Sequence, residues 1–374
     1  MRILFLSTLF VFLSHFHLAS GYETEAKQAI LIDAKTGQIL FQSNATELMH
    51  PSSMTKIMTT YIAFEDIKNG KLSLSDKFTT SEKAWKMEGS RMFLNYGDVV
   101  SLDDLLKGII VQSGNDACVV FAEGTHGDES LFVERMNKTA AKLGMTQTNF
   151  TNASGWPDPK NLSTARDLSK LALRLVRDFP EYYEYHKIST FTYCNIKQNN
   201  RNVLLGKLGV DGIKTGHTEA GGYGIVLSAF NKGRRLIAVI NGLPADKMRA
   251  QEGEKILNYG FNSFDYVNLF KANQKIEVAK VQYGEKPFVN IGVKEDMQIL
   301  SNDSAEKFHC EISYPNIVKA PINEGDKVGT VKCKVPNIDG DYITSDLVAV
   351  ENIKNANFIQ KIFQNIEYLF SSKE

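Results

Sequence analysis

The stretch Pro51-Ser52-Ser53-Met54-Thr55-Lys56 opens an apolar run that continues through Ile57, Met58, Tyr61, Ile62, Phe64 and Ile67. The spacing of these apolar residues predicts a helix. Ser53 and Lys56 are three residues apart, so both side chains project from one face of that helix, with Cβ atoms about 5–6 Å apart. A serine hydroxyl becomes an effective nucleophile when a base lies beside it, and a neutral lysine can be that base. The alternative is a capping serine followed by a solvated lysine.

A second polar triplet, Ser113-Gly114-Asn115, separates two apolar segments that are predicted as helices. The first helix is expected to begin after Ser101, a capping residue with acidic residues in the turn that follows. The second covers residues 117–122. The triplet is either an ordinary turn between helices or a loop that brings Ser113 and Asn115 into a cleft.

A third stretch, Lys214-Thr215-Gly216, lies at the lip of a predicted strand. Apolar strands at 223–230 and 235–241, joined by a turn, follow it and predict an antiparallel meander. In this position the triplet would present a cation, a hydroxyl and the accessible backbone of a glycine along one edge of a cleft. A solvated turn is the alternative.

Composition restricts the classes of function. The 374 residues suggest two or three domains, and a formal net charge of zero gives no reason to expect a nucleic-acid partner. The four cysteines lack the spacing of a metal site, so neither a metal nor a cofactor is expected. Cys118 is predicted to be a buried thiol, whereas Cys310 and Cys333 either pair or stay free.

The two ends of the chain predict export and contact with a membrane. Residues 1–21 have the charge, apolar run and small residues of a signal peptide. Short strands punctuated by turns predict a small all-β domain over 275–350. Residues 352–374 form an amphipathic helix that either packs on this domain or lies in a membrane interface, and export favours the membrane.

The three polar triplets, in this order, form the joint signature of serine β-lactamases and penicillin-binding proteins. From about Gln28 to Val350 the chain closely resembles the bacterial D-alanyl-D-alanine carboxypeptidases, which are low-molecular-mass penicillin-binding proteins. Residues 163–167, 211–218 and Arg249 extend the resemblance. It implies an α+β fold: a transpeptidase-like catalytic domain over 22–264, with an antiparallel sheet flanked by helices, followed by the β domain and the terminal helix.

The resemblance also implies a role for each matched residue. Ser53 is the nucleophile that becomes acylated, Lys56 is its base, and Ser113 relays a proton to the leaving D-alanine. Asn115 binds Lys56 and the substrate amide, and Lys214 is the second cation that lowers the pKa of Lys56. The remaining matched residues bind substrate: Thr215 and Arg249 grip the terminal carboxylate together with Lys214, Gly216 leaves the backbone bare, and His217 acts through its backbone N–H.

The implied partners are peptidoglycan stem peptides ending in D-Ala-D-Ala, β-lactam antibiotics and, through the terminal helix, the outer face of the bacterial inner membrane. The implied processes are peptidoglycan synthesis, cell-wall biogenesis and control of cell shape in the periplasm. Three alternatives remain: a serine β-lactamase, a transpeptidase in which an amine takes the place of water, or a non-catalytic scaffold that binds the cell wall. The loop 149–161 contains Asp158 as its only acidic residue and lacks the glutamate that class A β-lactamases need for deacylation.

Overall fold

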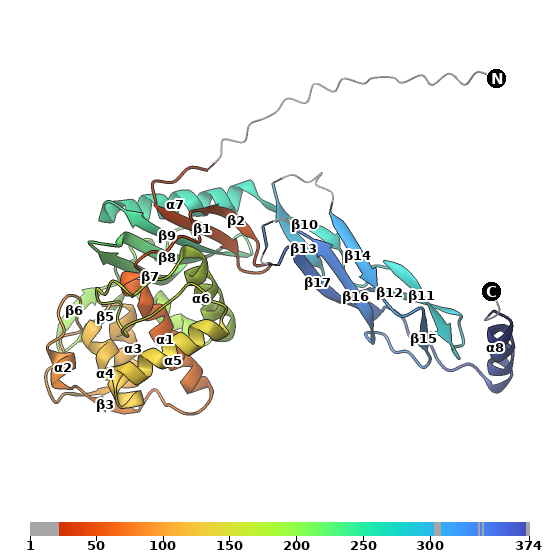
Figure 1. Ribbon diagram of the computed structural model, residues 1–374, viewed down its shortest axis with the longest axis horizontal. Helices are drawn as coiled ribbons and strands as arrows, with labels where there is room; N and C mark the ends of the chain where they lie inside the picture. Colours follow the sequence, from red (N-terminus) through yellow and green to blue (C-terminus); the bar gives the residue numbers. More distant parts are fainter. Residues whose placement is uncertain (1–21, 303–307, 336, 339, 372–374) are drawn as a thin grey trace, which may run out of the picture.

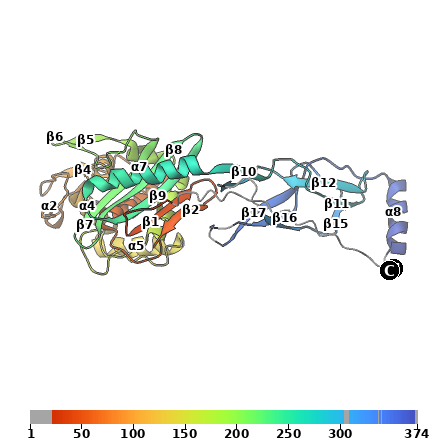
Figure 2. The ribbon, with the colours of Figure 1, turned by 90° about the horizontal axis from the view of Figure 1, so that it is seen from above.

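The computed structural model describes residues 22–302, 308–335, 337–338 and 340–371. The predicted signal peptide lies outside the described residues. The molecule is elongated (Figures 1 and 2): a sheet-and-helix domain forms one end, an all-β domain follows, and the last helix lies at the other end. The predicted α+β fold class is confirmed.

The first domain is built on a five-stranded antiparallel sheet in the order β2-β1-β9-β8-β7. Helices cover both faces, which is why all six residues of β1 are buried. Because side chains alternate between the faces of a strand, Ile30 and Ile32 pack in one core and Ala29 and Leu31 in the other. The strands are β1 Gln28–Asp33, β2 Ile39–Ser43, β7 Val210–Thr218, β8 Gly222–Asn231 and β9 Arg234–Leu243.

The helices of this domain divide between the two faces of the sheet. Helix α7 packs on β8 and β9, and α6 lies against β1 and β9 on the opposite face, together with the rest of the helical region (Figure 1). The helices are α1 Lys56–Lys68, α2 Glu82–Trp85, α3 Leu102–Ile110, α4 Asn115–His126, α5 Glu129–Lys142, α6 Ala165–Asp178 and α7 Asp246–Ser263. Two small hairpins complete the domain: β3 Lys77–Thr79 with β4 Val99–Ser101, and β5 Thr190–Tyr193 with β6 Ile196–Asn199.

Local sequence signals locate most helix ends. Ser101 accepts a hydrogen bond from the backbone N–H of Asp104 at the start of α3, and Thr164 accepts one from Asp167 at the start of α6. Helix α1 ends at Lys68, before Gly70 with φ of 70°. The α3 helix stops just before Ser113-Gly114, as its polar triplet predicts.

Gly260 lies inside the last helix of this domain, although glycine more often follows the end of a helix. Helix α7 continues to Ser263, and Arg249 lies in its first turns. Gly260 is there because α7 lies close to the sheet: a Cβ atom at this position would be 2.6 Å from Leu236 Cδ1 and 2.7 Å from Leu31 Cδ2. The glycine therefore serves packing rather than capping.

The second domain is all β and has its own hydrophobic core. A six-stranded sheet has the order β14-β16-β17-β12-β11-β15, and β10 pairs with β13 in a separate ladder. The strands are β10 Asp265–Phe270, β11 Glu277–Gln282, β12 Phe288–Val293, β13 Met297–Ser301, β14 His309–Ser313, β15 Ile317–Lys319, β16 Lys327–Lys334 and β17 Tyr342–Ala349.

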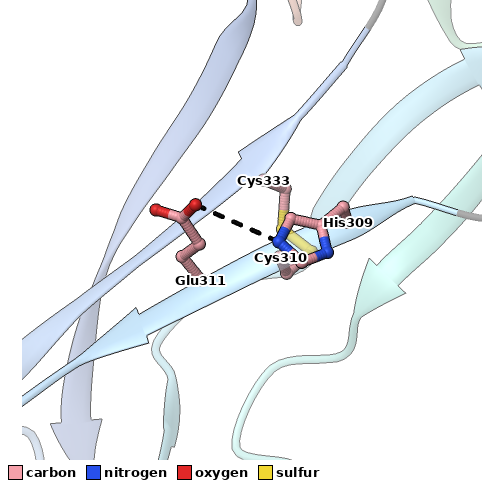
Figure 3. The surroundings of a disulfide bond; sticks show 4 residues. All are labelled: His309, Cys310, Glu311 and Cys333. Carbon is pink, nitrogen blue, oxygen red and sulfur yellow. Dashed lines mark ion pairs between the residues drawn. A yellow bond between two sulfur atoms is a disulfide. The ribbon is translucent and has the colours of Figure 1, made fainter.

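Two of the four cysteines form a disulfide bond. Cys310 of β14 and Cys333 of β16 face each other in the ladder and are joined (Figure 3), which decides between the two alternatives that the sequence left open. Cys118 is buried as a free thiol, as predicted, and Cys194 is free and exposed. The disulfide ties an edge strand to the sheet of the β domain, far from the catalytic residues.

The terminal helix α8, Phe358–Ser371, lies at the far end of the β domain (Figure 2). Gln364 holds it there, because its side chain accepts a hydrogen bond from the Tyr283 N–H and donates one to the Gly284 carbonyl. Within the described ranges, no helix is long and apolar enough to cross a bilayer.

Candidate active site

The predicted site residues line one cleft of about 1080 Å³ in the first domain. Its walls come from the turn before α1, the junction of α3 and α4, the loop 155–157, strand β7, the segment 199–203 and helix α7. Of the nine predicted site residues, seven line the cleft directly: Ser53, Ser113, Asn115, Thr215, Gly216, His217 and Arg249. The two lysines, Lys56 and Lys214, are buried immediately behind this surface.

Ser53 and Lys56 are in direct contact. Ser53 lies in a short 3₁₀ turn, Ser52–Thr55, which leads into α1 and exposes the hydroxyl to the cleft. Lys56 is only 1 % exposed, and its Nζ lies 3.1 Å from Ser53 Oγ. The alternative of a capping serine with a solvated lysine is therefore wrong: the serine makes no capping hydrogen bond and the lysine is buried.

Lys56 has two further acceptors. Its Nζ donates to Asn115 Oδ1 at 2.7 Å and to the Ser154 carbonyl at 2.6 Å. A neutral amine has two N–H donors and one lone pair, so these two acceptors can take both donors and leave the lone pair for the Ser53 hydroxyl.

Burial lowers the pKa of Lys56 to about 8, because a charged ammonium loses its hydration in the interior. The positive charge of Arg201 lowers this pKa further, while nearby Cys118 and Asp116 oppose the shift. Burial also lowers the pKa of Lys214 well below its usual value, with the charges of Lys56 and Arg201 acting in the same direction. A pKa near 8 leaves an appreciable fraction of Lys56 neutral at neutral pH.

The triplet Ser113-Gly114-Asn115 forms the opposite wall of the cleft. Ser113 has φ of 60°, a left-handed conformation that turns the chain sharply between α3 and α4. Asn115 begins α4, and its side chain is fixed at both ends, since Oδ1 accepts from Lys56 and Nδ2 donates to the Glu88 carbonyl at 2.8 Å. The neighbouring Asp116 carboxylate is buried and accepts from the backbone N–H groups of Met92 and Leu94, which anchors the adjacent loop.

Lys214-Thr215-Gly216 lies within β7, the edge strand of the sheet, rather than at its lip. Lys214 and Thr215 are each 4 % exposed, so the alternative of a solvated turn is wrong. Gly216 allows β7 to approach the serine turn, because a Cβ atom there would lie 3.0 Å from the Pro51 carbonyl oxygen. An edge strand has backbone groups free to pair with an extended ligand.

Cationic side chains gather at one end of the cleft. Arg249 Nη1 donates to the Gly216 carbonyl at 3.3 Å, and its Nη2 forms an ion pair with Asp246. The Arg249 guanidinium lies over the ring of Tyr223, 5.3 Å from its centroid, and the same ring stacks on His217 at 3.9 Å. Together with Lys214 and Arg201, Arg249 makes this end suitable for a carboxylate.

Three groups at the site escaped the sequence analysis: the Ser154 carbonyl, Arg201 and Trp156. Lone basic and aromatic side chains in loops carry no signal of their own. Asn152 does carry one, because asparagine often bonds to the backbone a few residues on. Its Oδ1 accepts from the backbone N–H groups of residues 154, 155 and 156, which holds this loop against the catalytic residues.

An antiparallel sheet between helices, with a buried lysine bonded to a serine in a turn that packs against the edge strand, is the arrangement of a serine acyl-transfer enzyme. The family model for D-alanyl-D-alanine carboxypeptidase matches residues 16–244, and that for the C-terminal domain of penicillin-binding protein 5 matches residues 264–355. The chain belongs to the D-alanyl-D-alanine carboxypeptidase family and is a serine-type carboxypeptidase of the penicillin-binding type.

Similar proteins agree with this assignment. D-alanyl-D-alanine carboxypeptidase DacC of Escherichia coli (strain K12) is 37% identical over 92% of this chain and 88% of its own. The crystal structure of penicillin-binding protein 5 from Haemophilus influenzae has a TM-score of 0.75 and 36% identity, over 88% of this chain and 98% of that one. Penicillin-binding protein D2 from Listeria monocytogenes, in its ampicillin-bound form, has a TM-score of 0.59 and 29% identity over 63% and 97% of the two chains.

Gly155→Ala tests how closely the loop 152–156 must approach the serine turn. Gly155 has φ of 76°, and a Cβ atom there would lie 1.8 Å from the Ser52 carbonyl oxygen. The backbone must shift, so we expect the melting temperature to fall. The shift also moves the Ser154 carbonyl away from Lys56, so the rate of acylation by benzylpenicillin should fall about tenfold or more. This rate is measured by intact-protein mass.

Gly206→Ala is the matched control. Gly206 has φ of 79° but open space around its Cβ position. Alanine there should lower the free energy of unfolding by about 1–2 kcal/mol, which is the cost of a left-handed conformation for a residue with a side chain. Equal effects of the two substitutions on acylation would show that the close approach of Gly155 has no importance for the site.

Proposed function

We propose that this carboxypeptidase removes the terminal D-alanine from peptidoglycan stem peptides ending in D-Ala-D-Ala, through an acyl-enzyme on Ser53. The observation that supports these roles most strongly is the environment of Lys56, which is buried, has a lowered pKa and lies 3.1 Å from Ser53 Oγ. Lysine is a general base only in such surroundings, since in water it is protonated at neutral pH.

In the acylation step, neutral Lys56 takes the proton of Ser53 as Oγ attacks the carbonyl carbon of the penultimate D-alanine. Asn115 Oδ1 and the Ser154 carbonyl accept hydrogen bonds from the two N–H groups of the neutral amine. Its lone pair is then directed at the Ser53 hydroxyl. The backbone N–H groups of Ser53 and His217 bind the oxyanion that forms. One such donor typically contributes about 3–4 kcal/mol to the transition state.

The tetrahedral intermediate collapses when the bond to the leaving D-alanine breaks. Its amine needs a proton, and the Ser113 hydroxyl passes on the one that Lys56 accepted. Water then attacks the ester carbonyl, Lys56 again takes a proton, and Ser53 is released with the shortened peptide. Each turnover therefore consumes one water and returns the enzyme to its starting protonation state.

The cationic end of the cleft binds the terminal carboxylate of the substrate. Thr215 and Arg249 line this position, Lys214 is buried behind it, and Gly216 keeps the edge of β7 open to the peptide backbone. Because substrate binding requires a free terminal carboxylate, the enzyme is a carboxypeptidase rather than an endopeptidase. Asn115 holds the amide on the other side of the scissile bond.

β-Lactam antibiotics acylate the same serine. A penicillin has a strained amide and a carboxylate placed as in D-Ala-D-Ala, and the Listeria relative has been crystallised with ampicillin. Deacylation is slow compared with a β-lactamase, because the loop group that reaches Lys56 is the Ser154 carbonyl and not a carboxylate. The penicilloyl-enzyme therefore accumulates.

The protein acts in the periplasm after removal of residues 1–21 and attaches to the outer face of the inner membrane through α8. Four large apolar side chains of this helix are exposed: Phe358 by 79%, Ile359 by 64%, Ile362 by 45% and Phe363 by 64%. Gln364 binds the β domain, so the packing of α8 leaves the apolar side chains outside. Burial in a lipid interface removes them from water.

The pKa of Lys56 predicts how acylation depends on pH. Only neutral Lys56 accepts the serine proton, so the second-order rate with benzylpenicillin should be maximal above pH of about 8 and fall about tenfold per unit below it. The rate is measured by intact mass, and Ser53→Ala, which should form no adduct, is the control. A rate that stays constant between pH 6 and 9 would exclude Lys56 as the base.

Arg249→Ala tests the carboxylate site. The loss of one charge-assisted hydrogen bond should lower kcat/KM about tenfold or more on peptides that end in a free carboxylate, with a much smaller effect on the matching ester. D-Alanine release and ester cleavage are assayed side by side, and Arg249→Lys should recover part of the activity. Equal losses on both substrates would argue against a carboxylate clamp.

Replacing Phe358, Ile359 and Phe363 by serine tests the attachment. The full-length triple variant should no longer float with vesicles of phosphatidylethanolamine and phosphatidylglycerol, because three large exposed apolar side chains of α8 are removed. Gln360→Ser, a polar change on the same helix, should leave flotation intact. Flotation of the triple variant at the level of the unmodified chain would place the membrane contact elsewhere.

A further inference from the structure

Helix α5 supports the loop that carries the Ser154 carbonyl, which is one of the acceptors of Lys56. Glu129 is the first residue of α5, and its Oε1 accepts a hydrogen bond from the backbone N–H of Ala153 at 3.0 Å. Ala153 immediately precedes Ser154 in the chain, and both residues are buried. The Glu129 carboxylate therefore holds the loop one residue away from the carbonyl that contacts the lysine.

The same loop residue is held from its other side by the helix that carries Lys56. Thr59, one turn further along α1, donates from Oγ1 to the Ala153 carbonyl at 2.6 Å. The two peptide groups that flank Ala153 are thus both fixed, one by Glu129 and the other by Thr59. The Ser154 carbonyl belongs to the next peptide group, so these contacts set its position at 2.6 Å from Lys56 Nζ.

Glu129 is also connected to the segment that holds the other acceptor of Lys56, Asn115. Its Oε2 forms an ion pair with Lys83 of α2 at 2.7 Å, and the Glu129 side chain is only 12% exposed. Shortly after α2, the Glu88 carbonyl accepts a hydrogen bond from Asn115 Nδ2 at 2.8 Å. One carboxylate therefore links the two segments of the chain that place acceptors on the lysine.

We propose that Glu129 is a positioning residue for acylation, because it holds the loop that directs the Ser154 carbonyl at Lys56. A hydrogen bond to an ionised carboxylate is stronger than one to a neutral acceptor, so it suits a loop that must be placed accurately. A misplacement of about 1 Å at a reacting group can slow a reaction about a hundredfold. Glu129 acts from behind the loop and is not among the described residues that line the cleft. The inference rests on the proposed role of Lys56 as the base.

Three substitutions separate the reach of the Glu129 side chain from its charge. Glu129→Gln keeps an oxygen at the same reach for the Ala153 N–H, whereas Glu129→Asp keeps the charge on a side chain that is shorter by a methylene. Acylation of the full-length protein by benzylpenicillin, followed by intact-protein mass, should stay within about threefold of the unmodified rate in Glu129→Gln. It should fall about tenfold or more in Glu129→Asp and Glu129→Ala, because the Ser154 carbonyl moves.

The pH at which acylation is half-maximal is a readout that a simple loss of stability would not change. The Ser154 carbonyl favours the ammonium form of Lys56 by accepting its hydrogen bond, so loss of this acceptor lowers the pKa of Lys56. The half-maximal pH should therefore fall in Glu129→Asp and Glu129→Ala and stay at its unmodified value in Glu129→Gln. The titratable groups that interact with Lys56 are the same in all variants: Asp116, Cys118, Arg201 and Lys214.

Glu134→Ala is the matched control, because it removes another glutamate of α5 together with its ion pair to a lysine, Lys138, at 3.5 Å. Both partners of this pair are exposed, so the rate and the half-maximal pH should stay unchanged. An unmodified rate in Glu129→Asp, a rate in Glu129→Gln as low as in Glu129→Asp, or an unchanged half-maximal pH in Glu129→Asp would overturn the proposal. Failure of the underlying role of Lys56 is distinguishable, because the unmodified protein would then acylate without pH dependence or form no adduct.

Discussion

The structure of the site depends on the burial of one amine. Lys56 is among the largest fully buried side chains of the described residues, and a buried ammonium is unfavourable unless it is neutral or well paired. The protein meets this requirement with acceptors from three separate parts of the chain: Ser53, Asn115 and the Ser154 carbonyl. The constraint therefore brings together the serine turn, the junction of α3 and α4, and the loop held by Asn152.

Much of the fold can be understood as support for this arrangement. The sheet is covered on both faces, and its edge strand β7 lies against the serine turn because Gly216 has no side chain to separate them. Gly155 allows an equally close approach from the other side. The same closeness places Lys56 near Lys214, and burial together with the charge of Lys56 lowers the pKa of Lys214 well below its usual value.

Charge is distributed unequally along the catalytic cleft. Arg201 and Arg249 line one end of the cleft, and Lys214 is buried behind its surface. The formal net charge of the whole chain is zero, so this positive charge is a local feature of the cleft.

The amino-acid sequence by itself determined the fold class, the capped starts of α3 and α6 and the three polar triplets, because these depend on local periodicity and on residue types at short spacing. Tertiary structure alone decided that Lys56 is buried, that Cys310 pairs with Cys333 and that Gly260 packs instead of capping. It also brought Arg201, the Ser154 carbonyl and Trp156 to the site. These features depend on contacts between residues far apart in the chain, and such contacts leave no local pattern.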